Sequence, residues 1–94
     1  MRYKINISLT AEYELDDITL WYENQKEGLG FRFGEVILEA FELLRESPYL
    51  FAPYNVHYRR MVLPRFPYSI IYEVSEEERI ITILRVVHQK RGVD

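Results

Sequence analysis

The sequence contains no cysteine, and this absence removes several kinds of chemistry at once. Without thiols, the chain of 94 residues has no disulfide, no thiolate nucleophile and no cysteine-ligated metal site. Its only histidines are His57 and His88, which give little support to a metal centre, so we expect no metal and no cofactor. The lack of cysteine also fits a reducing compartment, and we expect a cytoplasmic location.

Long hydrophobic runs are missing as well. No apolar stretch approaches the roughly 20 residues that a membrane-spanning helix needs, so we expect no membrane partner. The first seven residues are too polar for a secretory signal. Low-complexity segments are absent and 48% of the residues are hydrophobic, which is typical of a folded protein. We therefore expect residues 1–94 to form a single domain.

Acidic side chains are missing from two stretches of the C-terminal third, residues 56–72 and 80–91. The formal net charge of the whole chain is −3, so overall composition does not account for this segregation. The cations of both stretches, with the histidine that neighbours those of the second, are Arg59, Arg60, Arg65, Arg85, His88, Lys90 and Arg91. The pattern predicts a local basic patch that binds phosphates or an acidic partner.

The preceding part of the chain has the opposite charge. Residues 12–46 contain ten acids and three bases, a net charge of 3 − 10 = −7. An acidic helical half and a basic sheet half would give the molecule two unlike faces.

The first half of the chain reads as one strand followed by two helices. Residues 3–9 alternate between apolar and polar, as in a half-buried strand, and Thr10 is the expected N-cap of a helix that runs to about Gln25. Gly28 and Gly30 mark the turn, and Pro48 ends the second helix. The expected buried faces are Ala11, Leu15, Ile18 and Tyr22 in the first helix and Phe33, Val36, Ile37, Ala40, Phe41 and Leu44 in the second.

The second half carries three strand signals, at residues 56–63, 68–74 and 79–88. The last is almost continuously apolar, which predicts a central strand covered on both faces. Short links join the three strands, so we expect an antiparallel sheet with a helical hairpin on one face. This is an α+β fold.

Two C-terminal motifs are the most specific in the sequence: Arg-Phe-Pro-Tyr-Ser-Ile-Ile-Tyr at residues 65–72 and Val-Val-His-Gln-Lys-Arg at residues 86–91. With Leu-Thr-Ala-Glu at residues 9–12 and Trp-Tyr-Glu at residues 21–23, their order and spacing resemble the RelE/ParE superfamily of type II toxins. These are the small toxic halves of bacterial toxin–antitoxin pairs. The resemblance implies an N-terminal strand, a helical hairpin and a three-stranded antiparallel meander, which form one sheet packed on the helices.

The resemblance also implies partners and two possible activities. RelE-like members cut mRNA on the ribosome, whereas ParE-like members inhibit DNA gyrase. Both kinds are neutralised by a cognate antitoxin, so we expect a toxin–antitoxin hetero-oligomer whose target is either gyrase or the ribosome with its mRNA.

The candidate site residues come from the basic stretches. RNA cleavage needs a group that titrates near neutrality and several cations, which makes His88, Arg60 and Arg91 the candidate catalytic residues. The expected binding residues are Arg59, Arg65, Arg85, Lys90 and Tyr58. Adjacent strand residues face opposite ways, as do residues three apart, so Arg59 and Arg60 should diverge and Arg85 and His88 should lie on opposite faces.

The choice between activities depends on two positions that differ from the nucleases. Val62 and Ser69 stand where RelE-like nucleases carry a lysine and an arginine. The sequence therefore favours a ParE-like toxin that binds an essential target such as gyrase. A ribosome-dependent endoribonuclease and a non-toxic protein-interaction module remain the alternatives.

Overall fold

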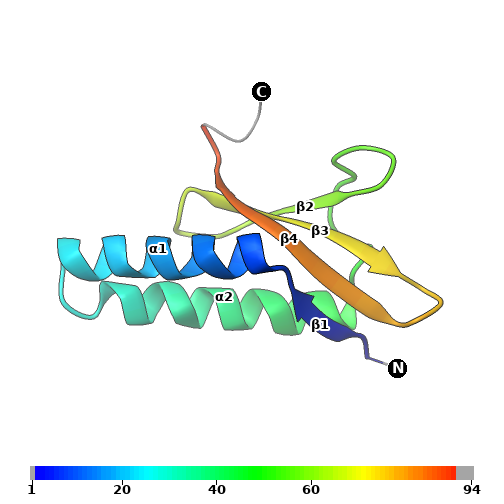
Figure 1. The fold of residues 1–94 in the computed structure, drawn as a ribbon, viewed down its shortest axis with the longest axis horizontal. Coiled ribbons are helices and arrows are strands. Elements are labelled where there is room, and N and C mark those ends of the chain that lie inside the picture. Colours follow the sequence, from blue (N-terminus) through cyan, green and yellow to red (C-terminus); the bar gives the residue numbers. More distant parts are fainter. Residues whose placement is uncertain (1, 91–94) are drawn as a thin grey trace.

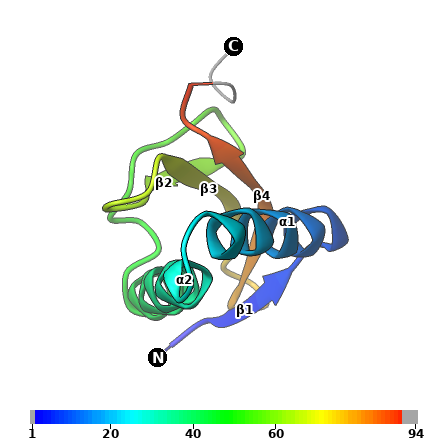
Figure 2. The same ribbon diagram turned by 90° about the vertical axis from the view of Figure 1, so that its left-hand side faces the viewer.

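The computed structural model describes residues 2–90, and its two helices form a hairpin that lies against one face of a sheet (Figure 1). Viewed nearly along the helix axes, the sheet covers one side of the hairpin (Figure 2). The elements in chain order are β1 (Lys4–Ile7), α1 (Leu9–Gln25), α2 (Leu29–Glu46), β2 (Arg59–Val62), β3 (Tyr68–Ser75) and β4 (Ile80–His88). The fold class expected from the sequence is confirmed.

The strands are ordered β1-β4-β3-β2 across the sheet. β2, β3 and β4 form the expected antiparallel meander. The expectation of a wholly antiparallel sheet is wrong, because β1 pairs with β4 in parallel. A parallel pair needs a long connection, and the helical hairpin and two further strands provide it here.

β4 lies inside the sheet as expected, but its pattern of burial is interrupted. Ile71 of β3 lies opposite Arg85 and the next residue, Tyr72, lies opposite Ile83, so Leu84 is the extra residue of a bulge. Ile83 and Val86 are buried on either side of this bulge, whereas Arg85 is exposed. The expectation that both faces of β4 are covered is therefore wrong, because the helical hairpin packs on one face.

Ser8 joins β1 to α1 and is the N-cap of the helix. Its hydroxyl accepts a hydrogen bond from the Ala11 N–H at 3.1 Å and donates one to the Leu84 carbonyl of β4 at 2.9 Å. The expectation that Thr10 caps this helix is wrong by two residues. At Ser8 a single hydroxyl can both cap α1 and bond the Leu84 carbonyl, which lies just beyond the part of β4 that pairs with β1.

Glycines control the turn and the contact between the helices. Gly28 has a φ of 88°, a left-handed conformation that favours glycine. Gly30 is buried where α2 approaches α1, and a Cβ atom at this position would lie 2.8 Å from the Thr19 carbonyl oxygen. The carboxylate of Glu23 on α1 accepts hydrogen bonds from the N–H groups of Gly28 and Gly30, at 2.9 and 3.0 Å.

Alanine at Gly30 and at Gly34 should have opposite effects on stability. Gly30→Ala forces α2 away from α1, and we expect it to lower the free energy of unfolding by about 1–3 kcal/mol. Gly34 lies on the same helix and has nothing within 4 Å of an added Cβ. Gly34→Ala should therefore raise stability by about 0.5–1 kcal/mol through helix propensity. Urea denaturation of both variants measures the difference, and equal shifts would contradict the close contact.

The core lies between the hairpin and the sheet. Phe33 of α2 contacts the rings of Tyr22 and Phe66 at centroid distances of 5.6 and 5.2 Å, and that of Tyr68 at 6.1 Å. Every residue expected on the two buried helix faces is buried or packs against this core, including the half-buried Leu15. The helical periodicity of the sequence is thus confirmed.

The segment after α2 is held by tyrosine hydroxyls. Tyr72, whose pKa is raised by burial to about 12, donates to the Pro48 carbonyl at 2.6 Å. Tyr3 and Tyr49 both donate to the Glu76 carboxylate in the β3–β4 turn, and these hydrogen bonds lower the pKa of Glu76. Neither helix is long and apolar enough, among the residues that the structure describes, to cross a bilayer.

Candidate binding groove

A groove of about 1250 Å³ opens between α1 and the C-terminal end of β4. One wall is formed by α1, the floor by β3 and β4, and the other wall by the loop that precedes β2. Of the candidate residues expected from the sequence, Tyr58, Arg85 and His88 line this groove. It is therefore the place where segments distant in the sequence meet.

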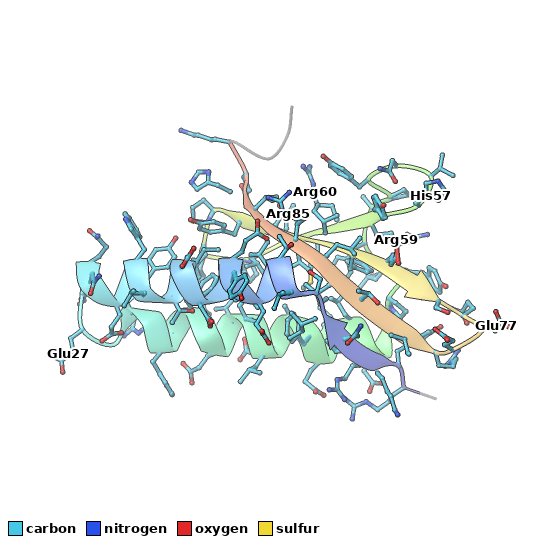
Figure 3. The ribbon with its side chains drawn as sticks, in the orientation of Figure 1. Glu27, His57, Arg59, Arg60, Glu77 and Arg85 are labelled. Carbon is cyan, nitrogen blue, oxygen red and sulfur yellow. The ribbon has the colours of Figure 1, made fainter. Side chains whose placement is uncertain are left out.

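Two of the expected cations belong to one row across the sheet. Arg60 of β2 lies opposite Ile71 of β3, and Ile71 lies opposite Arg85 of β4, so all three share the face that bears the groove. Figure 3 labels both arginines, which come from the two strands on either side of β3. The guanidinium of Arg60 is 6.0 Å from the ring centroid of Tyr54, a groove residue, and thus lies at the rim.

Arg59 lies apart from this row, as its spacing from Arg60 predicted. Its side chain donates to the Phe51 carbonyl at 2.7 Å and its guanidinium is 4.9 Å from the centroid of the Tyr49 ring. Arg59 thus braces the segment between α2 and β2, and it does not line the groove.

Arg85 is not available as a free cation. The Glu14 carboxylate of α1 accepts from its Nε at 2.8 Å and lies 2.7 Å from its second terminal nitrogen. The same carboxylate accepts a hydrogen bond from the Val86 N–H at 2.8 Å. This backbone donor lies on the edge of β4 beyond the residues that pair with β1, so Glu14 supplies the partner that a strand would otherwise provide. The hydrogen bond that Arg85 donates to Glu14 raises the pKa of Arg85. Glu14 therefore neutralises half of the charge that the arginine row brings to the groove.

His88 is the last residue of β4 and its ring stands edge-on to that of Tyr68 at 5.1 Å. Its Nδ1 accepts a hydrogen bond from the Lys90 N–H at 3.2 Å. Residue spacing placed His88 and Arg85 on opposite faces, and their partners across the sheet, Tyr68 and Ile71, agree. Both nevertheless line the groove, because β4 ends at His88.

The other candidate residues are dispersed. Arg65 lies in the β2–β3 connection and lines a second, smaller hollow beside Arg32 and Glu35 of α2. The Lys90 side chain is exposed and does not line the groove. Arg91 lies outside the described residues.

The loop wall is a tight turn that carries Tyr54 and Tyr58. The side chain of Asn55 accepts from the N–H groups of His57 and Tyr58, both at 2.8 Å, and the N–H of Tyr54 bonds to the Tyr58 carbonyl at 2.8 Å. These bonds hold both tyrosines at the groove. His57 is exposed in the same loop and does not line the groove (Figure 3).

Sequence reasoning missed the contribution of α1. Glu14, Asp17 and Trp21 all line the groove, although none of them was among the site residues expected from the sequence. With Thr10 they are spaced by four, three and four residues, so they form a stripe beside the buried one. That periodicity was the available signal, but only the packing of α1 along β4 shows that this second stripe faces the groove.

The described residues contain no cluster of three or more side chains suited to hold a metal ion. The groove instead combines aromatic rings, one paired arginine, one arginine at the rim and carboxylates along α1. Such a groove is suited to binding a segment of a polymer that carries polar and charged groups.

Solved structures with the same fold span almost the whole chain. The chromosomal ParDE toxin–antitoxin system from P. aeruginosa superposes with a TM-score of 0.78 and 21% identity, covering 93% of this chain and 96% of its own. The RelBE2 toxin–antitoxin complex from Mycobacterium tuberculosis gives 0.69 and 22%, covering 94% and 99%. The archaeal RelE–RelB complex from Pyrococcus horikoshii OT3 gives 0.62 and 17%, covering 98% and 100%.

Comparison with curated proteins finds no match. Residues 5–93 match the family model described as the ParE toxin of the type II toxin–antitoxin system parDE. The match takes in both helices, all the strands after β1 and most of β1 itself. The chain therefore belongs to the ParE toxin family.

Proposed function

We propose that this chain is a toxin that arrests growth by binding an essential protein such as DNA gyrase, and that a cognate antitoxin silences it in a hetero-oligomer. Membership of the ParE family supports the toxin role. The similar solved structures are toxin–antitoxin systems or complexes, which supports an antitoxin partner. Residues 1–94 would then form one toxin domain that acts in the cytoplasm, where its target is found.

The observation that carries the choice of a protein target is the charge of the groove. Glu14 is bound to Arg85, and Asp17 adds another carboxylate on the same wall. Against these two acids stand Arg85 and, at the rim, Arg60, so the four charges cancel. A site that binds RNA and stabilises a phosphorane needs an excess of cations.

Two further positions support a protein target. Val62 and Ser69, which replace the lysine and arginine of RelE-like nucleases, lie directly opposite each other on β2 and β3. Val62 is 52% exposed and Ser69 is buried. The two positions that carry cations in RelE-like nucleases are thus paired neighbours on β2 and β3, and neither is charged in this chain.

Ribosome-dependent mRNA cleavage is the second candidate, and His88 favours it. Because its Nδ1 accepts the Lys90 N–H, the neutral ring carries its proton on Nε2 and can donate it. Tyr58 in the same groove offers a ring on which a base could stack. In that case His88, Arg60 and Arg91 would be the catalytic residues.

Three measurements test the proposal. Induced expression without the antitoxin should arrest growth, and the purified chain should inhibit supercoiling by gyrase while leaving ribosome-bound mRNA intact. Cleaved mRNA with normal supercoiling would replace the gyrase proposal with the nuclease. Undiminished growth at confirmed expression would instead favour a non-toxic interaction module.

A further inference from the structure

On the α1 wall of the groove, one acidic and one aromatic side chain are exposed. Asp17 is exposed, and within residues 2–90 its carboxylate has no hydrogen bond or ion pair. One turn further along, Trp21 is 57% exposed and its ring stands edge-on to the largely buried Tyr22 at 5.2 Å. A carboxylate and a fixed indole four residues apart on one helix face are suited to a guanidinium or ammonium group.

The opposite wall has the complementary charge. Arg60 lies beside the Tyr54 ring, and its guanidinium makes no ion pair with any described carboxylate. The groove therefore has an anionic end at α1 and a cationic end at β2. The buried Ile71 lies on the floor between them.

This polarity identifies the class of occupant. A nucleic acid strand carries only negative charge, so the α1 wall repels it. A polypeptide can supply a basic side chain at one end, an apolar one over the floor and an acidic one at the other end. The volume of about 1250 Å³ is also larger than the roughly 300–1000 Å³ typical of small-molecule sites and suits a segment of chain.

Building on the proposed function, we infer that the antitoxin places an arginine or lysine between Asp17 and Trp21, and an acidic side chain at Arg60. A flexible antitoxin segment can follow a groove of this kind by folding as it binds. Once seated, the segment covers Arg60. Neutralisation then follows from occlusion of the groove.

The antitoxin is first identified as the product of a neighbouring reading frame whose co-expression with the toxin restores growth. Binding of that purified antitoxin is measured by calorimetry for the parent toxin, Asp17→Asn and Trp21→Ala. We expect a loss of affinity of about tenfold or more for each, the size of an interface hot spot. The matched controls are Asp16→Asn and Leu20→Ala, which are exposed on α1 outside the groove and should change affinity less than about twofold.

A second set of measurements identifies the basic residue. Each arginine and lysine of the antitoxin is replaced by alanine, and one replacement should have no additional effect in the Asp17→Asn background. Rising salt should weaken the parent complex more than the Asp17→Asn complex. Circular dichroism checks that all toxin variants fold.

Three results would overturn the inference. Parental affinity for both Asp17→Asn and Trp21→Ala would show that the groove wall is not the contact, while the toxin–antitoxin assignment would stand. Binding of a single-stranded RNA probe by the parent toxin, weakened by Trp21→Ala, would make this a nucleic-acid groove. If no neighbouring product restores growth or binds the parent, the proposed antitoxin partner fails as well.

Discussion

Replacing Arg60 by alanine is expected to reduce toxicity at least tenfold, measured as surviving colonies after induction without the antitoxin. Arg60 is the cation of the Arg60–Ile71–Arg85 row that no described carboxylate neutralises. Loss of a hot-spot arginine costs about 2 kcal/mol or more, about 30-fold in affinity for the target. Fold and expression should be unchanged, because Arg60 pairs with Ile71 and so lies on the face of the sheet opposite to the core residues Ile70 and Tyr72.

The matched control is Arg65→Ala. Arg65 is another arginine of the sheet region, but it is exposed and lies at the second hollow beside α2. It should therefore remain as toxic as the parent. Growth arrest by Arg60→Ala at the parental level, with equal expression, would exclude the groove face as the toxic surface. The sequence pattern leads us to expect reduced toxicity from Arg91→Ala too, a position outside the described residues.

The largest effect on stability is expected from Phe33→Ala. Phe33 is fully buried and contacts three other rings, those of Tyr22, Phe66 and Tyr68. Its truncation should lower the free energy of unfolding by about 3–5 kcal/mol, because both the transfer energy and the contacts around the cavity are lost. For a domain with about 5–15 kcal/mol of total stability, this is a large share.

Phe31→Ala provides the comparison two residues earlier on the same helix. Phe31 is 72% exposed, so its truncation should change stability by no more than about 0.5 kcal/mol. Guanidinium chloride denaturation of both variants measures the difference. Similar losses for Phe31→Ala and Phe33→Ala would mean that the described core is wrong at its centre.

Local patterns predicted the elements and the core well. The 3.6-residue spacing of Ala11, Ile18 and Tyr22 marks a helix face whichever partner covers it, because helix geometry alone places these side chains together. The same holds for the buried face of α2. Boundaries were less accurate: strand signal extended from residue 56, but β2 begins at Arg59, because Asn55 holds the preceding residues in a turn.

The pairing of strands and the charge of the groove could not be read in this way. Short links define β2, β3 and β4 as a meander, but no local signal states that β1 lies parallel to β4. The Glu14–Arg85 ion pair joins residues 71 positions apart, so a count of cations in the C-terminal third overestimated the free positive charge.

By itself, the sequence determined which helix residues are buried, which segments are helices and strands, and that Arg59 and Arg60 diverge, because each of these depends on periodicity along a short stretch of chain. Only the tertiary structure decided which cations remain unpaired and which helix face borders the groove. Those properties depend on distances between segments far apart in sequence. It was the packing of α1 along the edge of β4 that placed the carboxylates of Glu14 and Asp17 beside the basic strands.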